Sequence, residues 1–387
     1  MAASHADVLI VGGGVIGSSI AYHLALRGTR VVVLDQMPPA TSPSASWASA
    51  GGVRQQRRDP REWALTRAAA QRWPGLAGEL GADIEFRQGG HLHVVETDDD
   101  LRALEERVAR ERDAGLDVQI VSAAEAQRLA PGIAETVIAG AFSPSDGQAN
   151  PVKTTRAFAA AASARGVSYR TGMPARLFRE HDRVRGAVAG DDAFTADTVV
   201  VAAGAWSAGL VEHIGVHLSI VPRGPQMILT DPAPPVLAPT VTGSGRALSL
   251  KQLPAGAYFI GGGWPSDVDA GGLAAGHHEI KAGRMTCTVR DDSVQGSWRV
   301  ATEVFAPLRT CRIRQAWCGL EGQSADGVPL IGPVPGVAGL YVAAGFSGHG
   351  FQLSPAVGAA VAASLHGEPA VELHPLSPTR AGAIGTD

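Results

Sequence analysis

Runs of apolar residues that end in glycine recur along the chain and predict buried strands. The first run covers residues 8–11, a segment whose apolar positions have helical spacing follows at 15–24, and a second run covers 31–34. This order predicts a strand–helix–strand unit of a parallel sheet, because strands buried on both faces are continuously apolar. Two further runs, 196–204 and 339–345, predict strands of the same sheet from distant parts of the chain.

The middle of the chain has a different pattern. Residues 221–304 are interrupted by glycine and proline and contain short alternating segments, which predicts an antiparallel sheet. Residues 60–80 and the charged segment 99–130 have helical spacing, and 89–96 alternates as a strand does.

The domain organisation follows from where these patterns fall. A chain of 387 residues is long enough for two domains. Because the parallel strands come from both ends and from the middle, we predict two interleaved domains in a mixed α/β and α+β fold. A Rossmann-like nucleotide-binding domain takes 1–80, 145–220 and 320–387, and an antiparallel-sheet substrate domain takes 81–144 and 221–319.

The first turn carries a dinucleotide-binding pattern. Gly12, Gly14 and Gly17 form GxGxxG between the first strand and the helix, and Asp35 ends the next strand. The first glycine permits the tight turn, the second lets a pyrophosphate approach the backbone, and the third packs the helix on the strand. Asp35 would accept hydrogen bonds from a ribose hydroxyl. The turn alone does not separate NAD from FAD.

Composition narrows the classes of partner. The formal net charge of −4 gives no electrostatic footprint for nucleic acid or an anionic membrane. Three cysteines without CxxC spacing indicate neither a disulfide framework nor a metal site, and a reducing cytoplasm fits them best. The N-terminus has the pattern of a first strand, and neither a signal peptide nor a membrane span is expected.

Several separated motifs resemble those of one family. The chain is similar to the FAD-dependent amine and amino-acid oxidoreductases that include D-amino-acid oxidase, glycine oxidase, sarcosine oxidase and dimethylglycine dehydrogenase. The resemblance covers nearly the whole chain, and its motifs beyond the first turn are SWASAGGVR, DGQANP, VVVAAGAWS, ADGVPLIGPVPGVAGLYVAAG and GFSGHGF. It implies a Rossmann-like FAD-binding domain with an interleaved antiparallel-sheet substrate domain.

The resemblance also implies which residues bind FAD. Around the first turn and its acidic strand end they are Gly12, Gly14, Ile16, Gly17, Asp35 and Gln36. The loop after the second strand contributes Ser46, Ala50 and Gly51, Ala175 meets the adenine through its backbone, and the AAGAW turn contributes Ala203, Gly204 and Trp206.

The C-terminal glycine loop is expected to open a helix under the pyrimidine end of the flavin. Its residues are Gly345, Phe346, Ser347, Gly348, His349, Gly350 and Phe351. Backbone N–H groups at a helix N-terminus are suited to the negative charge that collects there when the flavin takes up a hydride. His349 contributes position and backbone, and a proton-transferring imidazole is the sharper hypothesis.

The substrate side rests on one arginine and on departures from relatives. In sarcosine oxidases the second arginine of an Arg-x-x-Arg pattern binds the substrate carboxylate, which nominates Arg57 in VRQQRR, although a solvated basic loop is the alternative. Gln352 stands where those enzymes have a lysine. Their flavin-linking cysteine corresponds to Gly319, which predicts a non-covalent FAD with Cys318 in the core. In those enzymes a lysine assists the reaction with oxygen. The corresponding segment here, AGAYFIGGG, has no lysine, and the nearest one is Lys251.

The resulting prediction is an enzyme that oxidises the C–N bond of a small amine or amino acid to an imine, with oxygen or another electron acceptor. A 2-hydroxyacid oxidoreductase and a flavin-carrying subunit of a hetero-oligomer are the alternatives, because both use this fold. An NAD-only dehydrogenase is disfavoured by the distant strand motifs. His91 and His93 share one face of an expected strand, which predicts a half-exposed strand, with two metal ligands as the alternative. Tyr258 is expected in sheet packing or over the substrate, and His277 and His278 in a glycine-rich loop.

Overall fold

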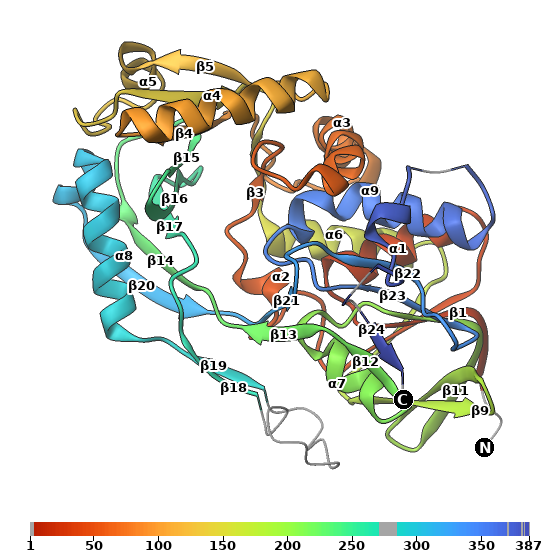
Figure 1. The fold of residues 1–387 in the computed structure, drawn as a ribbon. Coiled ribbons are helices and arrows are strands. Elements are labelled where there is room, and N and C mark those ends of the chain that lie inside the picture. Colours follow the sequence, from red (N-terminus) through yellow and green to blue (C-terminus); the bar gives the residue numbers. More distant parts are fainter. Residues whose placement is uncertain (1–3, 271–284, 370, 381, 383, 387) are drawn as a thin grey trace.

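The computed structural model describes residues 4–270, 285–369, 371–380, 382 and 384–386, and within them two large sheets lie on either side of a central cavity. The predicted histidines His277 and His278 lie outside the described residues. Figure 1 shows the two sheets apart from one another, with helices packed against each.

The first sheet is built on the predicted strand–helix–strand unit. Its strands follow the order β22 (Leu330–Pro333), β23 (Leu340–Ala344), β11 (Asp192–Val201), β1 (Ser4–Val11), β2 (Val31–Asp35) and β8 (Ser168–Thr171). The pairs from β23 to β8 are parallel, and β22 is antiparallel to β23. A hairpin of β9 (Ala175–Glu180) and β10 (Arg183–Ala189) continues from β11. The apolar runs fall on the buried strands, as their continuity predicted.

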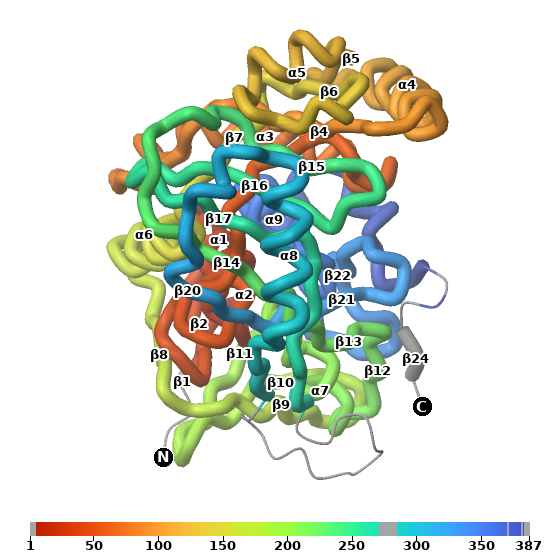
Figure 2. The backbone as a smooth tube through the Cα atoms, turned by 90° about the vertical axis from the view of Figure 1, so that its left-hand side faces the viewer, coloured from red at the N-terminus to blue at the C-terminus, as the bar shows by residue number. Residues whose placement is uncertain are grey.

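One face of this sheet is covered by helices from both ends of the chain. They are α1 (Val15–Ala25), α3 (Trp63–Leu80), α6 (Pro151–Ser163) and α9 (Gly350–Leu365). Figure 2 shows C-terminal α9 close to N-terminal α1, and buried side chains of both helices share one hydrophobic core. The opposite face packs against the β9–β10 hairpin and α7 (Ser207–Glu212) in a second core.

The second sheet has one face toward its helices and one toward the cavity. Its order is β20 (Ile313–Cys318), β14 (Gln226–Pro232), β17 (Ala257–Gly261), β16 (Arg246–Gln252), β15 (Thr240–Gly243), β4 (His91–Val95), β6 (Ala139–Ser143) and β5 (Gln119–Ser122). It is antiparallel as predicted, except that β15 and β4 run parallel. Leu92 and Val94 pack into the core under α8 (Asp291–Val304) and α5 (Ala123–Leu129), which leaves His91 on the cavity side.

Three expectations about this region were wrong. Segment 99–130 is not one helix, because Gly115 with φ of +80° follows the end of α4 (Asp98–Asp113), and β5 then precedes α5. The end of the expected antiparallel segment, 291–304, is helix α8, whose apolar residues face the sheet. His91 and His93 are each only 1% exposed, because segment 56–57 and the side chains of Thr242 and Ser244 cover this side of β4.

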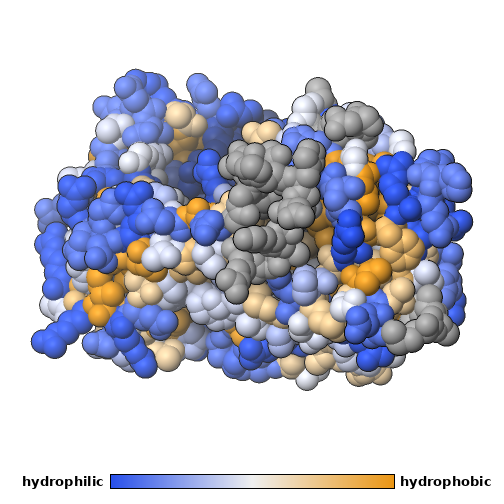
Figure 3. All heavy atoms as spheres, turned by 90° about the horizontal axis from the view of Figure 1, so that it is seen from below, coloured by the Kyte–Doolittle hydropathy of each residue, from blue (hydrophilic) through white to orange (hydrophobic). Residues whose placement is uncertain are grey.

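The outer surface is mostly polar. Figure 3 shows the face seen from below, where hydrophilic side chains predominate between smaller hydrophobic groups. Among the described helices, none is long and apolar enough to cross a membrane. Cys287, Cys311 and Cys318 are free thiols, and Cys318 is buried as expected. Tyr258 packs edge-on against Phe305 within the core of the second sheet.

Candidate active site

A cavity of about 910 Å³ runs between the two sheets and is lined by almost all of the residues expected to bind FAD. Of those residues, the lining includes every one except Gly17. A cavity of this size lies in the upper range of sites that enclose small molecules and cofactors. Its walls come from the first turn, the loop before β3 (Gly52–Val53), the turn after β11 and the loop before α9.

The glycine turn holds one end of the cavity in shape. Gly12 has φ of +111°, and a side chain there would overlap the carbonyl oxygen of Ala202. Gly17 lies behind the lining, where it packs against the carbonyl of Gly12. The N-terminus of α1 therefore points at the cavity with its backbone uncovered, which is the arrangement that binds a phosphate.

Two side chains adjust this turn. The Asp35 carboxylate accepts hydrogen bonds from the Gly13 N–H at 2.6 Å and the Met37 N–H at 2.9 Å, while burial raises its pKa. Each carboxylate oxygen keeps a further acceptor site for a ribose hydroxyl. The Ser46 hydroxyl accepts from the Val15 N–H at 2.9 Å and keeps its own hydrogen for a phosphate oxygen.

Buried donors without a protein partner also point to a bound group. The Trp206 indole N–H, in η2 (Gly204–Trp206), and the Ser44 hydroxyl, before α2 (Ala45–Ala48), lie on the cavity wall and have no hydrogen-bond partner among the described residues. Unpaired buried polar groups are rare in native proteins. The donors and the glycine-shaped walls together fit a dinucleotide such as FAD.

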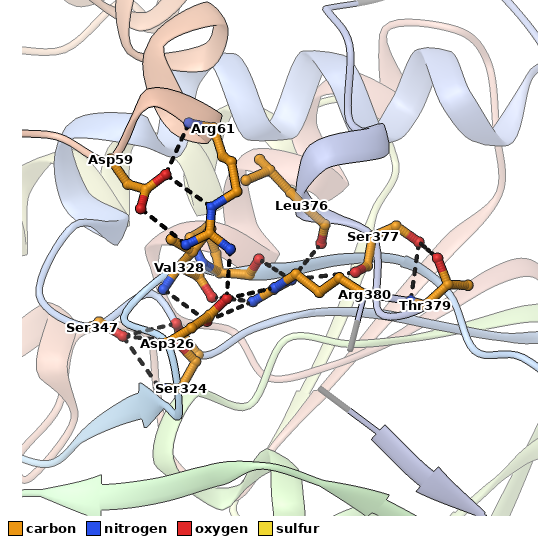
Figure 4. Close-up of polar contacts among 12 residues, drawn as sticks. Asp59, Arg61, Ser324, Asp326, Val328, Ser347, Leu376, Ser377, Thr379 and Arg380 are labelled. Atoms are coloured by element: carbon orange, nitrogen blue, oxygen red, sulfur yellow. Dashed lines mark hydrogen bonds and ion pairs between the residues drawn. The ribbon is translucent and has the colours of Figure 1, made fainter. Parts of the chain in front are cut away.

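The loop before α9 is fixed by the neighbouring strand β21 (Glu321–Ser324). The Ser347 N–H donates to the Gly322 carbonyl at 3.1 Å, and the Ser324 N–H donates to the Ser347 hydroxyl at 3.2 Å. Figure 4 shows Ser324 and Ser347 side by side. Gly345 and Gly348 have φ of +71° and +83°, a conformation that favours glycine. The N-terminal N–H groups of α9 thus open onto the cavity, as the resemblance implied.

His349 is held by a buried carboxylate. Its Nδ1 lies 3.1 Å from both oxygens of Glu62, which is fully buried in η1 (Pro60–Glu62). Burial and then the field of Arg58 lower the pKa of His349 to about 4, although Glu62 acts in the opposite direction. The imidazole is therefore neutral at pH 7, with Nδ1–H donating to Glu62 and Nε2 free to accept a hydrogen bond. Sequence reasoning missed Glu62, because only the fold brings it to the histidine.

Two arginines of the VRQQRR motif line the cavity, and Arg57 does not. The Arg57 N–H donates to Glu111 at 2.5 Å, and its side chain lies against His93, with 3.5 Å between Nη1 and Nδ1. Arg54 and Arg58 are on the cavity wall. The positive φ of Arg57, +61°, interrupts the extended chain and changes which side chains face inward.

Arg58 is a buried cation with a donor to spare, and Arg54 beside it is partly buried. Arg54 donates to the Gln56 carbonyl at 2.7 Å, and Arg58 donates from Nε to the Arg54 carbonyl at 3.3 Å. Arg58 Nη1 is buried and has no partner among the described residues. Burial lowers the pKa of Arg58 to about 10 and that of Arg54 well below its usual value, and it raises the pKa of nearby Asp146 to about 7.

Gln352 also lies outside the cavity lining. It is buried in α9, and its side-chain amide donates to the Thr66 carbonyl of α3 at 3.1 Å. Lys251 is 3% exposed, with Nζ 5.2 Å from the centroid of the Phe259 ring. Burial lowers the pKa of Lys251 to about 7. Neither residue is at the cavity wall, so any role in the site is indirect.

The substrate sheet closes the cavity with a mixed face. His91, Met227, Thr240, Thr242 and Ser249 line it from β4, β14, β15 and β16. His91 Nδ1 and the Thr240 hydroxyl are buried without partners among the described residues. Burial, followed by the fields of Arg54 and His93, lowers the pKa of His91 well below its usual value, so this wall is neutral.

Glu321 and Gly319 line the cavity from the end of β20 and the start of β21. Gly319 was the position expected from the resemblance to stand in place of a flavin-linking cysteine, and the thiol of Cys318 beside it is buried. Glu321 was not predicted as a site residue, because no motif in the sequence marks it.

Comparison with known proteins agrees with the site. Residues 7–364 match the model of the family described as DAO, FAD dependent oxidoreductase. The chain is 31% identical to a glycine oxidase of Geobacillus kaustophilus, over 98% of this chain and 99% of that protein.

Solved structures give the same answer over the whole fold. The structure of L-proline dehydrogenase from P. horikoshii superposes with a TM-score of 0.87 at 25% identity and covers 98% of both chains. The structure of glycine oxidase from Geobacillus kaustophilus superposes with a TM-score of 0.85 at 26% identity and covers 97% of this chain and 99% of that one. The chain therefore belongs to the DAO family of FAD-dependent oxidoreductases.

Proposed function

We propose that this FAD-dependent oxidoreductase oxidises the C–N bond of a small amino acid or N-alkylated amino acid to an imine, which water then hydrolyses. The observation that carries the proposal is the pair of neighbouring arginines on the wall of the cofactor cavity, the buried Arg58 and the partly buried Arg54. A buried guanidinium with an unpaired N–H is suited to a carboxylate, which it binds through charge-assisted hydrogen bonds. The similarity to a glycine oxidase and an L-proline dehydrogenase supports an amino-acid substrate.

The cofactor supplies the hydride acceptor, and the protein's own residues supply binding and orientation. Arg58, and Arg54 beside it, bind the substrate carboxylate and so fix which carbon–hydrogen bond faces the flavin. The N-terminus of α9 offers backbone N–H groups to developing negative charge. His349, neutral and held by Glu62, presents Nε2 as a hydrogen-bond acceptor beside the bound substrate. Arg57 supports this wall from behind through Glu111 and His93.

FAD is held without a covalent bond in this proposal. Gly319 lines the cavity where relatives have a linking cysteine, and the buried Cys318 thiol packs in the protein interior.

The test is anaerobic bleaching of the flavin spectrum by a panel of D- and L-amino acids, N-methyl amino acids and 2-hydroxyacids, followed by admission of air. Bleaching by an amine or amino acid is the expected result. Bleaching by 2-hydroxyacids alone would show that the enzyme oxidises a C–O bond and that the arginines bind a hydroxyacid carboxylate. Bleaching by neither class would favour a flavin-carrying subunit. The rate at which colour returns in air distinguishes an oxidase from an enzyme that uses another acceptor.

A further inference from the structure

Glu321 is an acidic residue on the cavity wall that has no role in the function proposed above. It begins β21, and its side chain lines the cavity beside the loop before α9. A β-carbon placed on Gly348 would lie 3.5 Å from one carboxylate oxygen and 4.0 Å from the other. The carboxylate therefore lies on the side of Gly348 where a side chain would project, beside the loop that the resemblance places under the flavin.

The carboxylate of Glu321 is not used by the protein. Among the described residues, no hydrogen bond or ion pair within 4.0 Å involves it. Arg223 lies opposite it in the backbone register of β13 (Ile220–Arg223), and its field favours the ionised form. Burial acts more strongly than that field and raises the pKa of Glu321 to about 7. A group of this kind is ionised just above neutral pH and accepts a proton readily.

The loop brings this acid close to the arginines. A β-carbon on Gly348 would reach the Glu321 carboxylate, and the next residue, His349, lies in the fields of Arg58 and Arg54. One cavity thus has a carboxylate and two guanidinium groups around consecutive residues of a single loop. An α-amino acid has the complementary charges, because its carboxylate and its ammonium group are both bonded to the α-carbon.

We infer that Glu321 is a catalytic base that removes the proton from the ammonium group of the bound substrate before the C–N bond is oxidised. The inference rests on the proposed function. In this step an N–H bond of the ammonium group breaks and an O–H bond forms on the Glu321 carboxylate. The step is a proton transfer, so nothing is oxidised or reduced. The neutral amine then has the lone pair that would form the C=N bond, and the bound FAD would supply the two-electron oxidant that accepts the α-hydrogen as hydride.

The step answers a chemical need of the reaction. An alkyl ammonium group has a pKa of about 10, so an amino acid reaches the enzyme protonated at neutral pH. It has no lone pair in that form. When Glu321 takes this proton, its own negative charge and the positive charge of the ammonium group are both neutralised. The loop before α9, where negative charge develops, then has a neutral carboxyl group beside it.

The first test is the pH dependence of anaerobic flavin bleaching at saturating substrate. In the wild type the rate constant should rise with pH through about 7 as Glu321 ionises. In Glu321→Gln it should fall by about a hundredfold or more at pH 7, lose the rise near 7, and recover as the pH approaches the substrate's own pKa. Glu321→Asp retains a carboxylate and should retain the rise, displaced in pH.

Two other groups have a pKa of about 7, Asp146 near the arginines and Lys251 outside the cavity lining, and both are intact in Glu321→Gln, so loss of the rise in that variant separates Glu321 from them. Arg223, opposite Glu321 in the register of β13, is unchanged in both variants. His349, next to the contacting Gly348, has a pKa lowered to about 4. The other elements near this strand, η2 and α2, carry no titratable side chain.

A binding measurement separates the base from a merely structural acid. The ligand 2-aminoisobutyrate has a carboxylate and an ammonium group but no hydrogen on its α-carbon, so it is not oxidised there. Isobutyrate is the matched ligand without the ammonium group. Glu321→Gln should weaken 2-aminoisobutyrate about tenfold or more, measured by perturbation of the flavin spectrum, and leave isobutyrate unchanged.

The outcomes are distinct. If no amine bleaches the wild-type flavin, the proposed function fails and the role of Glu321 with it. If amines bleach the wild type and Glu321→Gln with one pH profile, or the variant weakens both ligands equally, only the role of Glu321 is overturned. Flavin content is measured first, and if Glu321→Gln does not hold FAD, the presence or absence of the rise in Glu321→Asp decides.

Discussion

Neighbouring arginines of one motif face different surroundings, and this difference can be measured. Arg58→Lys keeps the charge but loses the planar fork, so the KM for a carboxylate substrate should rise by roughly ten- to a hundredfold through loss of charge-assisted hydrogen bonds. Arg57→Lys is the matched control and should change KM by no more than about twofold, because Arg57 does not line the cavity. The reverse result would return the carboxylate clamp to Arg57.

The reason for the ambiguity is local backbone geometry. The spacing of Arg54, Arg57 and Arg58 is legible in the sequence, but the positive φ of Arg57 is not. The structure places Arg54 and Arg58 on the cavity wall, and the residue left off it, Arg57, is the one with this positive φ. Glu62 and Glu321 were invisible for a related reason, since each becomes a site residue only through contact with the loop before α9.

Glycines of the first turn were predictable, because their role is a local steric one. Gly12→Ala combines an unfavourable φ with overlap on the Ala202 carbonyl, so the variant should bind little FAD and lose stability. Gly28→Ala is the matched control: Gly28 has φ of +76° but open space around its β-carbon position. It should cost only about 1–2 kcal/mol and keep its flavin. The ratio of flavin to protein absorbance checks both, and equal flavin loss would refute the steric argument.

At the scale of elements, one ion-pair network joins η1, the β21–β22 turn and the C-terminal segment. Asp326 accepts from Arg61 at 2.8 Å and from Arg380 at 2.9 and 3.0 Å, and Arg61 also pairs with Asp59 (Figure 4). These bonds hold the pKa of Asp326 well below its usual 3.8. Because η1 carries Glu62, the network also positions the partner of His349.

Asp326→Asn tests this network. It should lower the free energy of unfolding at pH 7 by roughly 1–2 kcal/mol, since Asp326 is partly exposed and solvent screens its pairs. Because the pKa of Asp326 is lower in the folded protein than in the unfolded chain, its carboxylate stabilises the folded state at pH values above the unfolded value of 3.8. The difference in free energy of unfolding between wild type and variant should therefore be constant above about pH 5 and shrink as the pH falls below 3.8. Thermal unfolding across this range measures it. Asp191→Asn, at an exposed position, is the control, and a difference that grows in acid would contradict the network.

Elements with long, strongly patterned segments were predicted, and short elements were not. The first strand–helix–strand unit, β23 and α3 follow directly from apolar spacing. The strand β5 has only four residues, and one of them is buried, so its sequence has no clear strand pattern. Its extended conformation is stabilised by pairing with β6. Which segments belong to which domain stays a prediction, although the two sheets draw on the segments assigned to them.

At the scale of the whole molecule, one ligand site joins segments from both ends of the chain. The first turn and Asp35 come from the N-terminal region, Ala203 and Trp206 from the middle, and the loop before α9 from the C-terminal region. A ligand that binds only the folded state at a hundred times its Kd adds about 2.7 kcal/mol of stability. FAD should therefore stabilise all of these segments at once.

Removal of FAD should make both ends of the chain sensitive to limited proteolysis, and added FAD should restore their protection. FMN is the matched control, because it lacks the adenosine part that Asp35 and Ala175 contact in this proposal, and it should protect the first turn and α1 less than FAD does. Equal protection by FMN would mean that the adenosine part contributes little to the ordering of this turn. In the same preparation, acid denaturation should release all of the flavin into the supernatant, because Gly319 offers no thiol and Cys318 is buried; colour retained in the precipitate would identify a covalent link instead.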